Sequence, residues 1–290
     1  MSFWLVTDAA CDLPQSYVEQ VEKITVMPMV YSMDGVEHPC ALGDVSTWHD
    51  FYEALRAGKV ATTSQVSTDS YLKEFRRLIA QGEEVLALVF SSGLSGTYQA
   101  AVLARNIVVE ENPQARILVV DSLCASAGEG LLVHYALQKR AEGLSLEDTA
   151  QWLEDNRQRL VHWFTVGSLD TLRRGGRVSA TAAFMGGMLQ IKPILHVDHE
   201  GKLIPREKVQ GRKKSLKRLA ELTNELAVPR EGQTVFISHG DCEEDAQYTL
   251  QCLKELGFQP QVVQFSAIGA IIGAHSGPGT VAIFFLGEHR

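Results

Sequence analysis

The chain has 290 residues, of which 45% are hydrophobic and 21% charged, a composition typical of a folded globular protein long enough for two domains. Its 35 Asp and Glu residues outnumber its 27 Lys and Arg residues, which gives a formal net charge of −8. This acidic balance argues against a general binder of nucleic acid or of anionic membranes, so any anion site has to be local.

The cysteines and the N-terminus indicate an intracellular protein. The five cysteines form no Cys-x-x-Cys pair and leave an odd count, which argues against a disulfide framework and against a structural zinc site. A strand begins almost at the N-terminus with no basic segment before it, and no uncharged run reaches the length of a membrane span. We therefore expect a cytoplasmic protein without stable membrane insertion.

The first half of the chain alternates buried strands with amphipathic helices. Continuous apolar runs predict strands at residues 3–7, 24–31, 85–90 and 116–120, with a hairpin tip at 33–36. Periodic segments predict helices at residues 14–22, 46–58, 71–79, 98–109, 131–140 and after Ser145. This alternation favours an α/β fold with a mainly parallel, doubly wound sheet in a domain spanning residues 1–164.

A small polar turn after the strand at 85–90 is the first candidate for a ligand site. It reads Ser91-Ser-Gly-Leu-Ser-Gly-Thr97 and runs directly into a helix. Backbone N–H groups, serine hydroxyls and the positive end of the helix dipole would point into one space, which suits an anion. Thr7–Asp8 and Asp121–Ser122 follow two other strands, and ligands of such folds bind at the carboxyl ends of the strands. The alternative is that a serine of this turn only caps the helix.

More specific functions for this turn are excluded because the residues that they require are missing. A nucleotide phosphate loop ends in Gly-Lys-Ser/Thr, and a dinucleotide fingerprint needs Gly-x-Gly-x-x-Gly, neither of which is present in the turn. The Gly-x-Ser-x-Gly elbow of hydrolases occurs nowhere in the chain. The turn is therefore expected to hold an anion and not to attack a carbonyl.

The second half predicts a domain with a mixed sheet at residues 165–290. Strands are expected at 162–166, 191–197, 202–205, 234–238, 261–265 and 281–286, and helices at 208–226 and 243–256. A turn at 168–172 leads into a basic, glycine-containing loop. His275 stands in a glycine-rich turn, where we expect its side chain to face a partner or to be structural.

Two other patterns have a structural explanation that competes with a functional one. Ser238–Asp241 and Glu243–Asp245 suggest a metal site, but capping and the helix dipole favour the same residues at a helix start, so we expect no metal. Met185, Met188 and Leu189 recur at helical spacing. Core packing is the default for such a stripe, and lining a ligand tunnel is the alternative.

Six collinear motifs span almost the whole chain. They are Val6-Thr-Asp-Ala-Ala-Cys-Asp-Leu-Pro14, Thr63-Ser-Gln65, Ser91-Ser-Gly-Leu-Ser-Gly-Thr-Tyr98, Leu172-Arg-Arg-Gly-Gly-Arg-Val178, Gly211-Arg-Lys-Lys214 and Gly273-Ala-His-Ser-Gly-Pro-Gly279. Together they resemble the DegV family of fatty-acid-binding proteins. The resemblance implies two α/β domains with one long-chain fatty acid in a tunnel between them.

The resemblance also implies a role. Better-understood members are binding subunits of a bacterial fatty acid kinase, and they present the carboxylate to a separate ATP-dependent subunit similar to dihydroxyacetone kinases. The acyl phosphate then serves phospholipid synthesis. A protein of this type is not catalytic alone and needs no cofactor besides its bound fatty acid.

The residues that match the family's carboxylate site are polar and stand at predicted turns. Thr63, Ser95 and His275 resemble the family's carboxylate ligands, and Ser92 with the Gly96 N–H group is a plausible second set. The rim of the opening, which resembles a surface for docking the kinase or stabilising the phosphoryl group, comprises Arg173, Arg174, Arg177 and Arg212, with Lys213 beside them. A solvated surface loop is the alternative for these basic residues.

Two departures and two other functions remain open. Many relatives have arginine where this chain has Gln210 and proline where it has Val66, and the first difference puts kinase docking in doubt. One alternative function is a hydrolase or transferase that uses the hydroxyl cluster with His275. The other is a fatty-acid carrier without a kinase partner.

Overall fold

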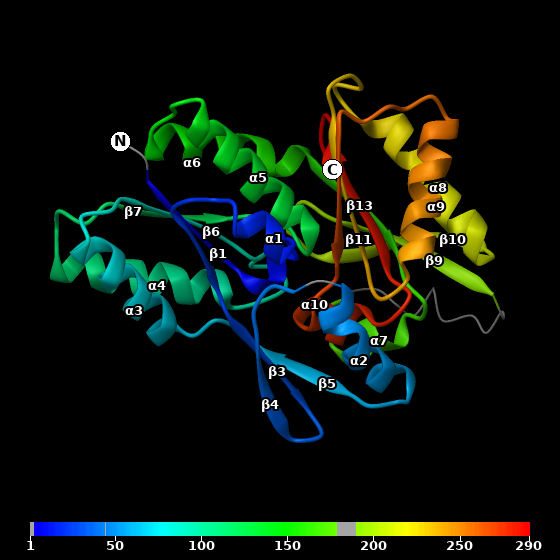
Figure 1. Ribbon diagram of the computed structural model, residues 1–290, viewed down its shortest axis with the longest axis horizontal. Coiled ribbons are helices and arrows are strands. Elements are labelled where there is room, and N and C mark those ends of the chain that lie inside the picture. Colours follow the sequence, from blue (N-terminus) through cyan, green and yellow to red (C-terminus); the bar gives the residue numbers. More distant parts are fainter. Residues whose placement is uncertain (1–2, 44, 179–189) are drawn as a thin grey trace.

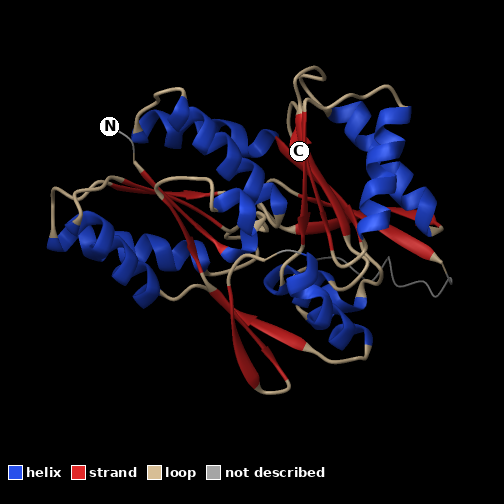
Figure 2. Cartoon of the chain, in the orientation of Figure 1, coloured by secondary structure: helices blue, strands red, loops and turns tan. Residues whose placement is uncertain are grey.

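The computed structural model describes residues 3–43, 45–178 and 190–290. Within these ranges the chain forms a four-stranded, a six-stranded and a three-stranded sheet (Figure 1). Helices lie on both sides of the two larger sheets, and the small sheet projects from the body (Figure 2). Met185, Met188 and Leu189, considered above for the tunnel wall, lie outside the described residues.

The four-stranded sheet is parallel, with strand order β2-β1-β6-β7. Its strands are β1 (Trp4–Asp8), β2 (Ile24–Met27), β6 (Val85–Val89) and β7 (Ile117–Asp121). Every residue of β6 is buried, as its apolar run predicts. Val85, Ala87 and Val89 belong to one core cluster and Leu86 and Leu88 to another, because successive side chains of a strand point to opposite faces.

Helices cover both faces of this sheet, which confirms the doubly wound prediction. α3 (Thr68–Ala80) and α4 (Thr97–Glu111) share the core that contains Val85. α5 (Ala127–Ala141) and α6 (Leu146–Asn156) share the core that contains Leu86. Ser145 caps α6 as expected, since its hydroxyl accepts the N–H of Asp148 at 3.1 Å.

The strand expected at 24–31 is two strands in different sheets. β2 ends before Pro28, and β3 (Met29–Met33) pairs antiparallel with β4 (Val36–Cys40) and β5 (Ala61–Ser64). Proline has no N–H to donate to a ladder, so pairing is interrupted there and the chain changes sheets. The hairpin tip is confirmed, with Asp34 and Gly35 both at positive φ between β3 and β4.

The six-stranded sheet is mixed, as the second domain was expected to be, with strand order β10-β9-β8-β13-β11-β12. Its strands are β8 (Leu160–Thr165), β9 (Ile191–Val197), β10 (Leu203–Gln210), β11 (Thr234–His239), β12 (Val262–Ala267) and β13 (Val281–Leu286). α8 (Arg212–Leu226) and α9 (Glu243–Glu255) cover one face. The other face packs on α5, so α5 lies between the two large sheets.

Several expected boundaries were wrong. The glycine-rich stretch around His275 contains a helix, α10 (Ala270–Ser276), and the turn expected at 168–172 leads into α7 (Asp170–Arg174). β10 continues to Gln210, so α8 begins at Arg212 and not at Lys208, after Gly211 at φ +92°. The remaining helices and turns are α1 (Gln15–Val18), α2 (Val45–Arg56) and the 3-10 turns η1 (Ala9–Cys11) and η2 (Arg157–Arg159).

Two points concern the chain as a whole. Among the described helices, none combines the length and apolar character needed to cross a membrane. The division of the chain at residue 164 stays a prediction, and β8, which spans this position, pairs with β9 and β13 in the second sheet.

Candidate functional site

A cavity of about 190 Å³ lies where loops of the parallel sheet, the small sheet, α7 and α10 meet, and we call it the acyl cavity. One part of its wall is apolar and contains Met29, Phe90, Leu94, Ala125, Leu172, Leu203, Ile271 and Ile272. The polar part contains Thr63, Gln65, Ser95, Gly96, Arg177, His275 and Ser276. A concave site lined by both apolar and polar residues suits an amphipathic small molecule.

Thr63 and His275 are paired on the polar part of the wall. Thr63 Oγ1, on β5, lies 2.8 Å from Nε2 of His275, on α10. The other ring nitrogen, Nδ1, is buried without a hydrogen-bond partner in the described structure. It faces Gly175, where a Cβ atom would lie 2.3 Å from Nδ1, so glycine is needed at that position for the ring to fit.

The imidazole of His275 is neutral at neutral pH. Burial, with a smaller contribution from the positive charge of Arg177, lowers the pKa of His275 to about 4. A neutral imidazole beside a threonine hydroxyl offers one donor and one acceptor. An incoming anion would stabilise the protonated ring and raise this pKa again.

The turn at 91–97 contributes Ser95 and Gly96 to the cavity wall. Ser95 Oγ accepts the N–H of Thr97 at 3.2 Å and lies 2.9 Å from Thr97 Oγ1. Ser92 is not part of this wall, and its N–H donates to Asp121 Oδ1 at 3.1 Å. The structure thus brings Thr63, Ser95, Gly96 and His275 together on one cavity and leaves Ser92 outside its lining.

The acids at the strand ends hold the loops that frame the cavity. Oδ2 of Asp8 accepts the N–H of Phe90 and Oδ1 accepts the N–H of Ala10, each at 3.0 Å. Asp8 is fully buried, and desolvation raises its pKa to about 6 in spite of these bonds. Asp121 Oδ1 similarly accepts two N–H groups, from Ser92 and Leu123. Through these hydrogen bonds, Asp8 and Asp121 hold the loops around the cavity in place.

Two of the four candidate rim arginines, Arg174 and Arg177, line a cavity, and a third, Arg173, precedes Arg174 in α7. Arg177 lines the acyl cavity and donates to the carbonyl oxygen of Gly175 at 2.5 Å. A second cavity of about 150 Å³ shares Thr63, Arg177 and His275 with the first and is also lined by Arg174. Arg173 and Arg174 are exposed at the end of α7.

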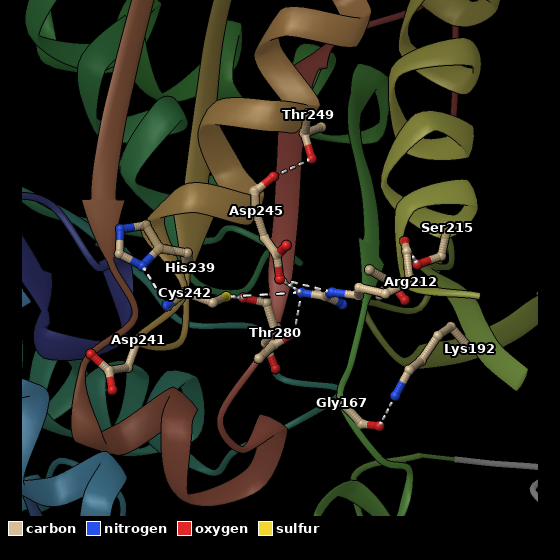
Figure 3. A network of polar contacts seen from close by, with 12 residues as sticks. Gly167, Lys192, Arg212, Ser215, His239, Asp241, Cys242, Asp245, Thr249 and Thr280 are labelled. Atoms are coloured by element: carbon tan, nitrogen blue, oxygen red, sulfur yellow. Dashed lines mark hydrogen bonds and ion pairs between the residues drawn. The ribbon is translucent and has the colours of Figure 1, made fainter. Parts of the chain in front are cut away.

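Arg212 lies elsewhere, at the start of α8 (Figure 3). Its Nε donates to Asp245 Oδ2 at 2.9 Å and its Nη2 to the carbonyl oxygen of Gly279 at 2.6 Å, which ties α8 to α9 and to the loop before β13. It lines neither cavity described above. Arg212 was predicted to belong to the rim because a sequence motif does not reveal the tertiary contacts of α8.

Several lining residues were not singled out as site residues from the sequence. Gln65 was noted only within a motif, yet its Oε1 lies 2.1 Å from where a Cβ of Gly96 would be. Ile271, Ile272 and Ser276 reach the cavity because residues 270–276 are helical. The spacing of apolar residues in that stretch could have indicated the helix, but its glycines suggested a turn.

Among the described residues, one cluster combines side chains that can bind a metal ion. It is not the Ser238–Asp245 cluster considered in the sequence. His49, Glu53 and Asp241 bring ligand atoms within 4.8 Å of one another. Arg56 Nη1 already pairs with both carboxylates of this cluster, so its guanidinium group supplies the positive charge that a metal ion would bring. His239 Nδ1 accepts the N–H of Cys242 at 3.3 Å, as expected for a structural turn.

Comparison with known proteins decides the family. The sequence model of the DegV family, described as "Uncharacterised protein, DegV family", matches residues 2–288. The chain belongs to the DegV family. A DegV domain-containing protein of Clostridium perfringens is 42% identical over 289 residues, which cover 99% of this chain and 98% of that protein.

Solved DegV structures have the same fold. One from Thermus thermophilus, described as fatty acid binding, has a TM-score of 0.88 at 29% identity and covers 99% of this chain and 100% of its own. A stearic acid-binding protein from Eubacterium ventriosum has a TM-score of 0.86 at 26% identity, with 99% and 98% covered. The fold class expected from the sequence is therefore confirmed, as is the family.

Proposed function

We propose that this DegV protein binds one long-chain fatty acid, with its carboxylate at the polar part of the acyl cavity. The observation that supports the proposal is that the paired Thr63 and His275 line the same cavity as Ser95, together with eight apolar residues. A solved DegV protein that shares this fold is described as fatty acid binding, and another solved protein with this fold is described as binding stearic acid.

The polar groups fit a carboxylate headgroup. Burying a carboxylate without partners costs several kcal/mol, so two or three converging donors are a physical need. The hydroxyls of Thr63 and Ser95 and the imidazole of His275 supply them, and Arg177 adds a positive charge on the same wall. Charge-assisted hydrogen bonds of this kind are about twice as strong as neutral ones.

The apolar wall fits the acyl chain. Each buried methylene group contributes about 0.8 kcal/mol, so a long chain binds tightly without specific contacts. A smaller cavity of about 50 Å³, which we call the inner cavity, shares Ala125, Leu172, Leu203, Ile272 and Ser276 with the acyl cavity. The chain would extend from the headgroup site toward this inner cavity.

The site suits a protein that carries a fatty acid better than one that catalyses hydrolysis or group transfer. A hydroxyl activated by histidine needs a third group that orients the ring, and Nδ1 of His275 has no such partner in the described structure. We therefore propose a subunit without catalysis of its own, acting in the cytoplasm with no cofactor besides the lipid. The exposed Arg173 and Arg174, of which Arg174 lines the second cavity, suit presentation of the carboxylate to a separate ATP-dependent kinase subunit for phospholipid metabolism.

Purification under native conditions, denaturation, organic extraction and mass spectrometry test the binding proposal. A long-chain fatty acid should be released in a ratio near one per chain, and much less of it from the Ser95→Ala, His275→Ala double variant. Ser70→Ala with His199→Ala is the matched control, because both side chains lie outside the cavities described above. A wild-type protein that comes out empty and takes up no added fatty acid would refute the carrier function.

The kinase role needs a separate test. The loaded protein is mixed with ATP and the host's dihydroxyacetone-kinase-like subunit, and acyl phosphate is trapped with hydroxylamine. Product is expected only when all three are present, and less of it from an Arg173→Ala, Arg174→Ala variant that still carries lipid. No product with an active kinase subunit would leave this chain a carrier without that partner.

A further inference from the structure

Gln65 stands at the solvent end of the acyl cavity. It follows β5 directly, and among the described residues that line this cavity it is the one that is exposed. The other lining residues are buried or half-buried. A residue that is exposed and also belongs to the wall marks the place where the cavity meets solvent. Gln65 therefore lies on the solvent side of the polar part of the wall.

The carboxamide of Gln65 reaches across to the turn at 91–97. Its Oε1 and Nε2 atoms lie 2.1 and 3.2 Å from the place where a Cβ of Gly96 would be, so the amide group packs against the Gly96 backbone. Thr63 and Gln65 are two positions apart at the end of β5, where alternate side chains point to the same side, and both line the cavity. The amide thus connects the segment that carries Thr63 with the turn that carries Ser95.

The hydroxyl and imidazole groups of the headgroup site have few protons to offer. With a neutral ring, the Thr63–His275 pair directs at most one proton toward a ligand, because the 2.8 Å contact between Oγ1 and Nε2 uses another. Ser95 Oγ supplies one more when Thr97 Oγ1 donates to it. A carboxylate has about four acceptor sites, so these side chains leave positions for a further donor.

The carboxamide of Gln65 can be that donor. It forms no hydrogen bond within the described part of the chain, and its Nε2 amino group carries two protons. We propose that Gln65 is a positioning residue that donates an N–H to the fatty-acid carboxylate from the solvent side and selects for this headgroup. The inference rests on the proposed fatty-acid binding and adds a specificity-determining residue to the same site.

Substitutions at position 65 separate a donor from a packing residue. Among the described residues that line the acyl cavity none is Asp or Glu, so Gln65→Glu keeps the shape of the side chain but brings a carboxylate to the wall. This group would repel a bound carboxylate and compete for its donors. Gln65→Met keeps the length of the side chain and removes the donor, whereas Gln65→Lys restores an N–H donor.

Equilibrium binding of radiolabelled palmitic acid to the delipidated full-length protein tests the assignment. Gln65→Met should raise the Kd about threefold to tenfold and Gln65→Glu at least about tenfold, while Gln65→Lys should stay within about threefold of the wild type. Gln114→Glu is the matched charge control and should leave the Kd unchanged. Gln114 is exposed in the loop before β7, at the opposite end of the parallel sheet from the turn that follows β6.

The outcomes separate this inference from the proposed function. A Kd that Gln65→Met leaves within about twofold of the wild-type value overturns the donor role, and fatty-acid binding stands. Equal losses in the Met, Glu and Lys variants also overturn it, because they would show that Gln65 acts only by packing on Gly96. A wild-type protein that does not bind palmitic acid refutes the proposed function itself.

Discussion

Asp12 accepts the backbone N–H of Gly269 at 2.9 Å, although 257 positions separate the two residues. Gly269 is the N-cap of α10, so Asp12, from the other half of the chain, fixes the backbone where this helix begins. Since α10 carries His275, a residue in the first loop sets the position of the candidate headgroup site.

Replacing Asp12 is expected to loosen α10. Asp12→Ala leaves the Gly269 N–H without its acceptor in a buried place, so the free energy of unfolding should fall by about 1–3 kcal/mol and fatty-acid affinity should fall with it. Burial raises the pKa of Asp12 to about 8, so a neutral Asp12→Asn side chain should retain most of both. Urea denaturation and ligand titration measure the two effects. Equal losses in both variants would contradict this role.

Thr63→Val removes the hydroxyl that pairs with His275 while keeping the shape of the side chain. Losing one donor to a buried carboxylate costs about 1–2 kcal/mol, so the Kd for a fatty acid should rise about fivefold to thirtyfold. Thr63→Ser retains a hydroxyl and serves as the matched control. Calorimetric titration with a long-chain fatty acid distinguishes them, and similar Kd values for the Thr63→Val and Thr63→Ser variants would remove Thr63 from the headgroup site.

Arg177→Gln should raise the pKa of His275. Burial is the larger cause of the lowered value of about 4 and the charge of Arg177 the smaller one, so the pKa should move upward yet stay below the usual 6.5. Histidine-labelled protein titrated by NMR gives the value, with His275→Gln identifying the signal. An unchanged pKa would show that the two side chains do not interact in solution.

Glu129→Gln should stabilise the protein increasingly as pH rises. Burial raises the pKa of Glu129 well above its usual value, with the charges of Asp8 and Asp12 acting in the same direction. Above about pH 4.5 the unfolded carboxyl is ionised while the folded one stays protonated, so the wild type loses up to about 1.4 kcal/mol per pH unit relative to the variant. Urea denaturation between about pH 5 and 8 measures the difference. A Glu129→Gln difference that stays flat across this range would refute this account.

Gly93→Ala tests the close approach of the two halves of the chain. A Cβ at residue 93 would lie 2.4 Å from the carbonyl oxygen of Glu200, a backbone atom in the turn between β9 and β10. Because neither backbone can move aside cheaply, we expect a loss of about 1–3 kcal/mol in the free energy of unfolding. Gly82→Ala, which has open space but a positive φ, is a comparison for backbone strain alone. Thermal denaturation unaffected by Gly93→Ala would mean that the halves are not in contact there.

Most of the fold could be predicted from local patterns. The apolar run of β6, the Asp34–Gly35 hairpin tip and the Ser145 cap depend on neighbouring residues and were correct. The strand at 24–31 and the turn around His275 failed for different reasons. Whether pairing continues past Pro28 depends on which sheet each side of it can join. Gly273 in α10 is needed for packing against Phe51 and Tyr52, a tertiary contact that the sequence does not show.

The candidate site, too, was predicted only in part from the sequence. Motif order alone brought forward Thr63, Ser95 and His275, because each stands in a short stretch whose composition is unusual, and it identified the family. Only the tertiary structure placed Arg212 on Asp245, away from the other three arginines, and packed Gln65 against Gly96 in the wall of the acyl cavity. Composition and spacing report on local backbone preferences. Which side chains meet across a cavity depends on the packing of sheets and helices from distant parts of the chain.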